Sequence, residues 1–540
     1  MAKHTKKDVY LFDTTLRDGE QAEGIAFTLH DKIRIAFALD EFGMDYIEGG
    51  WPGSNPKARD FFEYMKTHPL KHARLAAFGS TCRKKTHPKD DPQIKALLEA
   101  ETPVVVIFGK TWDFHVTHAL KTTLDENLRM IRDSVAFLKS HDREVIYDAE
   151  HFFDGYKANP DYALRALQAA RDGGADVIVL CDTNGGTMPT EIPPIMDAVR
   201  AAIPGTAIGI HTHNDAGMGV ANAVMAVYCG AVHVQGTTNG FGERCGNCDL
   251  VQVIPNLQIK YHKRCVEPRK LRELTSLSHF VAEMANMIPD PKKPYVGRHC
   301  FTHKGGIHVS AVLRDPSTYE HINPALVGNR RRVTVSEQSG KSNIVYKAAQ
   351  EYGLDPEQID AEAMQVLQEI KEMENEGFTF EAADGSVQVM LKKKMLQKTD
   401  FFDLQGYRVI IEKRRPNEQP VCEATVKLSI GGEPRYTVAE GDGPVNALDK
   451  ALRQAIAAIY PIVRHTQLTD YRVRVIDQKR GTAARVRVII ETTDGKKEWG
   501  TIGVSENIIE ASWQALVHGI EYKLLEEEEK KRKRSARSKK

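Results

Sequence analysis

The sequence of 540 residues lacks any apolar run close to the roughly 20 residues that a membrane-spanning helix needs. It also lacks an excess of either charge, because 74 basic residues stand against 73 acidic ones. The start, MAKHTKKDVYLF, has no apolar segment followed by a cleavage site. These absences predict a cytoplasmic protein and argue against general electrostatic binding to nucleic acid or to an anionic membrane.

Cysteine is scarce as well. Eight cysteines are scattered through the chain, whereas disulfide frameworks belong to small secreted domains. Cys245 and Cys248 form a C-x-x-C, but without a second pair they do not favour a zinc ribbon, and we interpret the thiols as buried or spectator groups. Since 41% of the residues are hydrophobic, the chain can bury several cores and is expected to form two or three domains.

What the first half of the chain does contain is a repeated alternation of a short β-rich run and a helical stretch. Apolar strands that alternate with helices predict a parallel sheet covered by helices, and eight such units favour closure into an α/β fold of the (β/α)8 TIM-barrel type. A doubly wound open sheet is the alternative. The predicted strands are Val9–Thr15, Tyr46–Trp51, Leu75–Thr81, Val104–Lys110, Glu144–His151, Val177–Thr183, Ala207–His213 and His233–Thr238.

Polar residues cluster at the ends of these predicted strands. The first strand ends in DTTLRDGE, the fifth in YDAEH, the sixth in CDTNGG and the seventh in HTHND, and the eighth leads to TTNGFGERCGN. In a barrel, the carboxyl ends of the strands build the active site. We therefore expect Arg17 and Asp18 to meet carboxylates, imidazoles and amides from other strands at one mouth.

The sharpest of these motifs is His211-x-His213. Side chains two apart on a strand point to the same face, so both imidazoles can face one ion, and borderline divalent metals accept such a nitrogen pair. A carboxylate from Asp18 would complete the set and leave positions open for substrate. The alternative is that the histidines only hydrogen-bond within a polar mouth. We favour a divalent metal, and the set suits magnesium, manganese, cobalt or zinc.

FDTTLRDGEQ, CDTNGG, HTHND and GERCGN, in this order, resemble the acyl-CoA-condensing metalloenzymes that include 2-isopropylmalate, homocitrate and citramalate synthases. YIEGGWPGSNPK and FTHKGGIHVSAVL resemble most the citramalate-forming branch, and the resemblance covers nearly the whole chain. It implies an acyltransferase that condenses acetyl-CoA with pyruvate in isoleucine biosynthesis. Condensation of acetyl-CoA with 2-oxoisovalerate, in leucine biosynthesis, is the alternative within the family. A metal-dependent amino-acid sensor without turnover is the alternative from another class.

The resemblance also implies the metal ligands. Asp18, His211 and His213 would bind the divalent ion, and Asn247 of GERCGN would be a nearby or direct fourth ligand. The structural alternative for Asn247 is a capping residue.

The remaining catalytic roles are likewise implied by the resemblance. Arg17 would stabilise the 2-oxo group and the alkoxide formed from it, Thr183 would hold the carboxylate of the 2-oxo acid, and Glu150 would organise the pocket. A general base for the methyl proton of acetyl-CoA is associated with His308 and, less firmly, with Tyr319. As structural alternatives, Thr183 would be a turn residue and Glu150 the partner of a barrel arginine.

Substrate size is expected to depend on aromatic residues near the ends of strands three to five. Phe78, Phe108 and Tyr147 are candidates to fill the space that a larger 2-oxo acid would need. The sequence does not fix which of the three rings point inward.

The rest of the chain divides at composition changes and at a repeat. The proline-rich NMIPDPKKPYVG marks a boundary, and SGKSN has Val335 where a phosphate loop needs glycine, so it is interpreted as a helix entry. Two copies of a strand-turn-strand-helix pattern occupy residues 404–526. The expected domains are a catalytic barrel over 1–290, connecting subdomains over 291–395, a regulatory α+β domain over 396–526 and a charged, disordered tail over 527–540.

The repeat domain resembles the regulatory domain of the leucine-pathway enzymes of this family. We expect isoleucine, or secondly leucine, as effector, and a homodimer or higher homo-oligomer. A purely structural or dimerising domain is the alternative. Ending the chain near residue 395 is expected to leave an active protein that has lost its inhibition.

Overall fold

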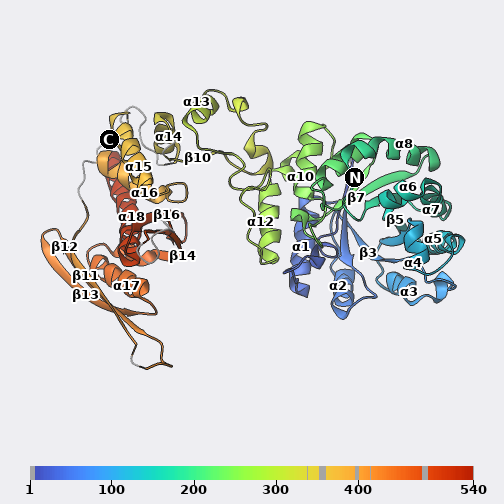
Figure 1. Ribbon diagram of the computed structural model, residues 1–540, viewed down its shortest axis with the longest axis horizontal. Coiled ribbons are helices and arrows are strands. Elements are labelled where there is room, and N and C mark those ends of the chain that lie inside the picture. Colours follow the sequence, from blue (N-terminus) through green and yellow to red (C-terminus); the bar gives the residue numbers. More distant parts are fainter. Residues whose placement is uncertain are drawn as a thin grey trace. The chain divides into compact units, whose positions relative to one another are not determined.

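The computed structural model in Figure 1 describes residues 7–336, 339–351, 360–395, 400–413, 415–476 and 484–538. The chain forms two compact units. The first extends to Phe301 and adds Asn323–Arg330, and the second contains Thr302–Ile322 and the described residues from Arg331 onward. None of the helices in the described residues combines the length and the apolar composition of a membrane span.

The first unit is a closed barrel of eight parallel strands in sequence order, and β1 closes the ring by pairing with β8, with Tyr10 opposite His233. This confirms the predicted (β/α)8 barrel, and each strand coincides with a predicted one to within two residues at either end. The strands are β1 (Tyr10–Asp13), β2 (Tyr46–Gly50), β3 (Arg74–Ser80), β4 (Val104–Lys110), β5 (Glu144–Glu150), β6 (Val177–Asp182), β7 (Ala207–Thr212) and β8 (His233–Gly236).

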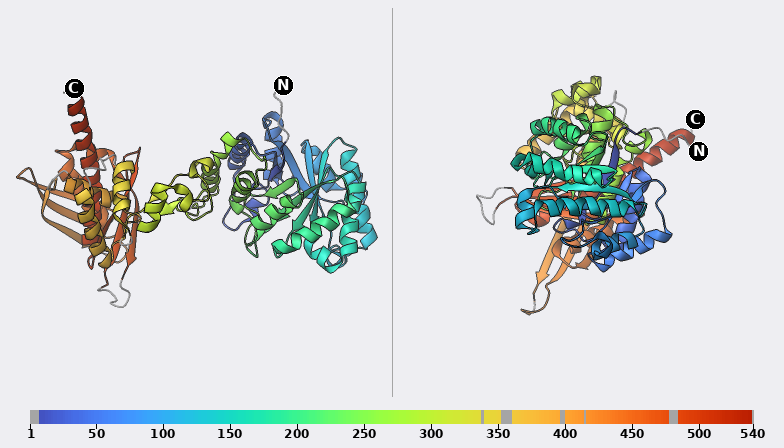
Figure 2. Two further views of the ribbon diagram at one scale, coloured as in Figure 1. Left: turned by 90° about the horizontal axis from the view of Figure 1, so that it is seen from above. Right: turned by 90° about the vertical axis from the view of Figure 1, so that its right-hand side faces the viewer.

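Helices lie outside the ring of strands (Figure 2). The first shows why they form where they do: Thr28 and Asp31 make a reciprocal capping box at its start, and Gly43, with a φ of 106°, ends it in the left-handed region. The main helices of the unit are α1 (Leu29–Phe42), α2 (Pro56–Thr67), α3 (Pro92–Glu99), α4 (Asp113–His118), α5 (Leu124–Lys139), α6 (Phe152–Ala158), α7 (Pro160–Asp172), α8 (Ile192–Ala202), α9 (Gly219–Tyr228), α10 (Leu250–Pro255) and α12 (Leu274–Met284).

Every second strand residue points into the barrel, because side chains alternate along a strand. The interior is filled by an apolar cluster that includes Phe12, Tyr46, Val106, Ile146 and Val179. By the same alternation, the inward-pointing side chains at the carboxyl end of each strand lie at the mouth of the barrel, next to this apolar cluster.

The second unit begins with a small α/β segment. Its two-stranded sheet pairs β9 (Thr302–His303) with β10 (Arg332–Val333). Gly340 caps α14, which confirms SGKSN as a helix entry. The helices are α13 (Gly306–Arg314), α14 (Lys341–Tyr346), α15 (Asp360–Asn375) and α16 (Asp384–Met395).

The repeat domain consists of two antiparallel three-stranded sheets, each followed by a helix, which confirms the repeat and adds one strand to each predicted strand-turn-strand-helix unit. The apolar core between sheets and helices contains Leu428, Leu452, Ile490, Leu516 and Leu524. The elements are β11 (Asp403–Glu412), β12 (Val421–Ile430), β13 (Glu433–Gly441), α17 (Pro444–Ala457), β14 (Gln467–Val475), β15 (Val486–Thr493), β16 (Glu498–Ser505) and α18 (Ile508–Ser538).

The predicted disordered tail is wrong over most of its length, because α18 continues to Ser538. Ion pairs one helical turn apart support this extension: Lys530 contacts Glu527 at 2.8 Å and Glu526 at 3.4 Å. The last two residues of the predicted tail lie outside the described residues.

Neither of the expected domain boundaries, near residue 290 and near residue 395, coincides with a break in the packing. Lys293 donates to Asn239 O at 2.8 Å and contacts Asp249 at 2.7 Å, so the chain beyond residue 290 is still tied to the barrel. At the other boundary, Val387 and Leu391 of α16 share one buried cluster with Ile502 of β16. A chain cut near residue 395 would expose this cluster, so that truncation would not separate catalysis cleanly from regulation.

Candidate active site

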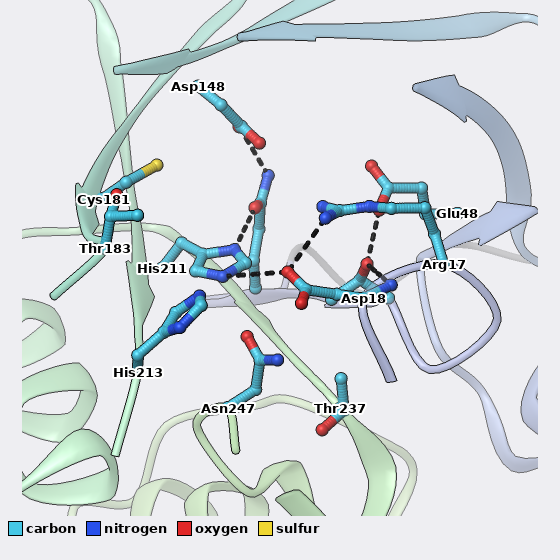
Figure 3. A network of polar contacts seen from close by, with 12 residues as sticks. Arg17, Asp18, Glu48, Asp148, Cys181, Thr183, His211, His213, Thr237 and Asn247 are labelled. Atoms are coloured by element: carbon cyan, nitrogen blue, oxygen red, sulfur yellow. Dashed lines mark hydrogen bonds and ion pairs between the residues drawn. The ribbon is translucent and has the colours of Figure 1, made fainter. Parts of the chain in front are cut away.

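The loop after β1 places Arg17 and Asp18 at the barrel mouth (Figure 3). Arg17 Nη1 lies 2.9 Å from Asp18 Oδ2, and Arg17 Nε lies 2.7 Å from Glu48 Oε2. Thr14 donates its hydroxyl to the same Glu48 oxygen. Although burial lowers the pKa of Arg17, the charges of Glu48 and Asp18 raise it above its ordinary value. The guanidinium is therefore permanently charged and held from two sides.

Asp18, His211 and His213 converge at the centre of this mouth. One potential ligand atom from each lies within 4.8 Å of the others, and all three side chains are buried. Both histidines point inward from the end of β7, as their spacing predicts, and His211 Nε2 lies 3.5 Å from Asp18 Oδ2.

The protonation states of this group suit a cation. Burial alone would raise the pKa of Asp18, but Arg17 and His211 outweigh it and hold that pKa at about 2. Burial lowers the pKa of His213 to about 3. At neutral pH the carboxylate is therefore ionised and the His213 imidazole neutral, which are the forms that bind metals.

Asn247 supplies an independent test of whether a metal fits. Its side chain is buried, and Nδ2 donates to Phe241 O at 3.1 Å. Its Oδ1 atom is buried and accepts no hydrogen bond from the described residues. Figure 3 shows this amide beside His213 and Asp18. A buried amide oxygen without a donor is suited to ligate a cation, so the donor set fits a divalent ion.

Arg244 contacts the second histidine. Its Nη2 donates to His213 Nδ1 at 2.8 Å and to Thr183 O at 2.8 Å, and its guanidinium pairs with Asp215. A guanidinium can only donate, so the Nδ1 lone pair of His213 is engaged and the ring proton stands on Nε2. A metal that takes a lone pair of His213 therefore requires Arg244 to release this contact.

Sequence reasoning missed three inward-facing residues of the mouth: Glu48, Asp148 and Gln235. Gln235 Nε2 donates to Asp148 Oδ1 at 2.9 Å, and Gln235 Oε1 lies 2.8 Å from His211 Nδ1. Burial and the neighbouring Glu48 charge raise the pKa of Asp148 well above its usual range. Strand periodicity was an available signal, because each is a polar residue at an inward position of a predicted strand.

Thr183 and Glu150 both lie at the mouth, in positions that allow either expected role. Thr183 Oγ1 accepts the backbone N–H of His151 at 2.9 Å. Glu150 forms an ion pair with Lys110, its register partner on β4. The partner of Glu150 is therefore a lysine rather than the arginine considered from the sequence.

An aromatic wall stands beside Arg17. Phe78 and Phe108 stack with ring centroids 5.5 Å apart, and Trp51 packs edge-on against both. The Arg17 guanidinium carbon lies 3.8 Å from the centre of the Phe78 ring. Phe78 and Phe108 thus face inward, whereas Trp51 is a member that the sequence did not indicate.

Tyr147 is not part of this wall. A Cβ atom at Gly109 would lie 2.8 Å from the Tyr147 hydroxyl and 3.1 Å from Ile131 of α5, so the ring occupies the layer between strands and helices. The candidate is wrong because Tyr147 has the opposite parity from Asp148 and Glu150 on the same strand.

His308 and Tyr319 belong to the second unit, where their rings stack at a centroid distance of 4.2 Å. The neighbouring Glu320 is buried and lies 3.1 Å from His303 Nε2 and 2.6 Å from Arg331 Nε. The two residues associated with the general base are thus brought together on an anchored segment.

Comparison with known proteins divides the chain into three parts. The HMGL-like family matches residues 8–281, the homocitrate synthase post-HMGL domain-like family matches residues 295–377, and the LeuA allosteric (dimerisation) domain matches residues 381–524.

Full-length relatives are also found. A protein of Aquifex aeolicus named (R)-citramalate synthase is 54% identical over 96% of this chain and 98% of its own. One of the same name from Geobacter sulfurreducens is 53% identical over 96% and 98%. A protein of Methanopyrus kandleri named probable 2-isopropylmalate synthase is 31% identical over 95% and 97%.

Proposed function

The chain belongs to the HMGL-like family, in the group of 2-isopropylmalate, homocitrate and citramalate synthases, and we propose that it condenses acetyl-CoA with pyruvate to give citramalate and CoA. It is an acyltransferase that converts the acyl group into an alkyl group on transfer. The observation that carries the proposal is the buried Asp18, His211 and His213 set beside a fixed Arg17 and an aromatic wall. The higher identity to the citramalate synthases than to the isopropylmalate synthase supports the choice within the group.

Asp18, His211, His213 and the amide oxygen of Asn247 would hold a divalent metal. When bound, such an ion supplies Lewis-acid polarisation of the 2-oxo group. Arg17 stabilises the negative charge that develops on the same oxygen. Because Glu48 and Asp18 already hold its guanidinium, this stabilisation requires no reorganisation during the reaction.

We assign the proton transfer to the His308 and Tyr319 pair. His308 takes a methyl proton of acetyl-CoA, and the resulting carbanion forms a C–C bond to the keto carbon of pyruvate. The alkoxide is then protonated, and water hydrolyses the thioester to citramalate and CoA, so that the overall reaction consumes one water. Thr183 binds the pyruvate carboxylate, and Glu150 keeps Lys110 in place at the pocket edge.

The aromatic wall supports pyruvate rather than 2-oxoisovalerate. Trp51, Phe78 and Phe108 occupy the space beside Arg17, where an isopropyl group would need room. A methyl group fits a filled pocket, and a filled pocket excludes larger substrates better than it rejects smaller ones.

The repeat domain supports regulation and self-association. We propose that the chain forms a homodimer or higher homo-oligomer and that isoleucine is the first effector and leucine the second. The match to the LeuA allosteric (dimerisation) domain favours both roles. The cytoplasmic location expected from the sequence stays a prediction.

The proposal is tested by measuring thiol release from acetyl-CoA with glyoxylate, pyruvate and 2-oxoisovalerate, with and without a chelator and with isoleucine or leucine added. We expect the highest kcat/KM with pyruvate, loss of activity with the chelator and inhibition by isoleucine. A preference for 2-oxoisovalerate would make the protein an isopropylmalate synthase. Absence of thiol release with every 2-oxo acid would instead favour the sensor.

A further inference from the structure

The proposed metal ligand His211 is hydrogen-bonded to a row of buried polar side chains that have no role in the proposed reaction steps. Gln235, on β8, lies between His211 of β7 and Asp148 of β5 and hydrogen-bonds with both. The exposed fractions are 5% for His211, 1% for Gln235 and 4% for Asp148, so water does not compete for these contacts.

The direction of each hydrogen bond follows from its chemistry. Gln235 Nε2 donates to Asp148 Oδ1 at 2.9 Å, and this oxygen accepts whether the carboxyl group is ionised or carries its proton on Oδ2. This leaves Gln235 Oε1 toward His211 Nδ1, at 2.8 Å. A carbonyl oxygen only accepts, so His211 must carry its proton on Nδ1.

The consequence appears on the other side of the ring. A neutral imidazole with its proton on Nδ1 has its lone pair on Nε2, and His211 Nε2 is the atom that lies 3.5 Å from Asp18. If the Gln235 amide were rotated by half a turn, it would donate to Nδ1 and force the proton onto Nε2, where it would block a metal.

We infer that Gln235, oriented by Asp148, is a positioning residue that fixes the tautomer of His211 and so prepares it to bind the metal. The inference rests on the proposed metal site and adds a residue to it. Outer partners of this kind set both the orientation and the basicity of a ligating histidine.

The chain offers a matched control on the same strand end. Thr238 is buried and donates its hydroxyl to Asp13 Oδ2 at 2.7 Å. Thr238→Val, like Gln235→Met, therefore removes a buried hydrogen bond to a carboxyl group while roughly preserving side-chain volume. Only the glutamine contacts His211.

The experiment measures the Kd of Co²⁺ by chelator competition with the full-length protein, together with the thermal unfolding of the metal-free form. We expect Gln235→Met to weaken Co²⁺ binding by about 10-fold to 100-fold. Gln235→Glu keeps an acceptor for His211 Nδ1 and is expected to bind Co²⁺ close to the native Kd. Thr238→Val should lower thermal stability and leave the Kd unchanged.

Native affinity in Gln235→Met, or an equal loss in Thr238→Val, would overturn the inference. If Gln235→Met does not fold, Gln235→Asn applies the same test, because it keeps the amide group on a side chain that is one methylene too short to bridge His211 and Asp148. Native Co²⁺ affinity in His213→Ala would instead show that the metal site itself is wrongly assigned, so the two failures are distinguishable.

Discussion

In the barrel mouth, several buried carboxyl groups stand around one arginine, whereas the buried charged groups of the second unit contact an opposite charge directly. Arg17 is shared by Asp18 and Glu48, and Asp148 is placed with a neutral glutamine as its donor. In the second unit, by contrast, each buried carboxylate has a lysine at contact distance: Lys393 lies 2.6 Å from Glu521 and also contacts Asp400, and Lys523 lies 2.6 Å from Asp494 and 2.8 Å from Glu526.

This difference distinguishes buried charges of the proposed active site from buried charges that only support the packing of the second unit. In and beside the mouth cluster, carboxyl groups without a contacting cation have displaced pKa values: burial raises the pKa of Asp13 to about 6, and burial together with the Glu48 charge raises that of Asp148 well above its usual range. Such clusters oppose folding and are characteristic of functional sites. Where each charge has its partner, as around Lys523, burial is compatible with a purely structural role.

The largest effect is expected from the buried His213, compared with the half-buried His518 of the second unit. Losing an outer partner of a metal ligand weakens binding about 10-fold to 100-fold, so losing a ligand should exceed that range. His213→Ala should therefore weaken Co²⁺ binding and turnover by more than about 100-fold while the barrel stays folded. The matched variant His518→Ala should lower only the stability of the second unit. If the activity of His213→Ala depended on the metal as that of the native protein does, His213 would not be a metal ligand.

A second test concerns the core that α16 shares with β16. Ile502 is fully buried in that cluster. Ile502→Ala should lower the free energy of unfolding of the second unit by about 2–5 kcal/mol. Hydrogen exchange of α16 and α18 measures this change, and Co²⁺ affinity of the barrel should not move. If α16 kept its native protection, it would be independent of the repeat domain and a cut near residue 395 would be clean.

A third test probes substrate size. Phe108→Ala removes one ring of the aromatic wall and so enlarges the space for the substrate, while it keeps the Phe78 ring that contacts Arg17. The ratio of kcat/KM for 2-oxoisovalerate to that for pyruvate should rise by about 10-fold or more. Tyr147→Phe serves as control, because Tyr147 faces the helix layer, and should leave the ratio unchanged. A shift in the control instead of the Phe108 variant would place the substrate pocket elsewhere.

The smallest effect is a pH dependence of the second unit. Burial lowers the pKa of His518 from 6.5 to about 4. Between these values the unfolded chain binds a proton that the folded chain does not, so the stability contribution is complete above about pH 6.5 and declines toward pH 4. Between pH 7 and pH 5 we expect a loss of about 1–2 kcal/mol that His518→Gln abolishes. If the free energy of unfolding in urea changed with pH in the same way for the native protein and for His518→Gln, the loss would come from other groups.

Much of the fold could be predicted because its signals are local. Apolar runs followed by helical stretches located all eight strands, and the spacing of His211 and His213 placed both rings on one face. The same rule already contained the correction for Tyr147, because a residue three positions before Glu150 on one strand must face the opposite side. The charged segment after residue 527 was misjudged, since composition does not report ion pairs one helical turn apart.

By itself, the sequence determined which residue types stand at the strand ends, and hence that a carboxylate, two imidazoles and an arginine would reach one mouth. Only the tertiary structure decided which atoms meet there. Gln235 contacts Asp148 across 87 residues because barrel closure brings β8 and β5 within reach of the same interior. Likewise, α16 shares a core with β16 only because the second sheet of the repeat domain packs against it. Periodicity acts within one element, whereas these contacts depend on how separate elements pack.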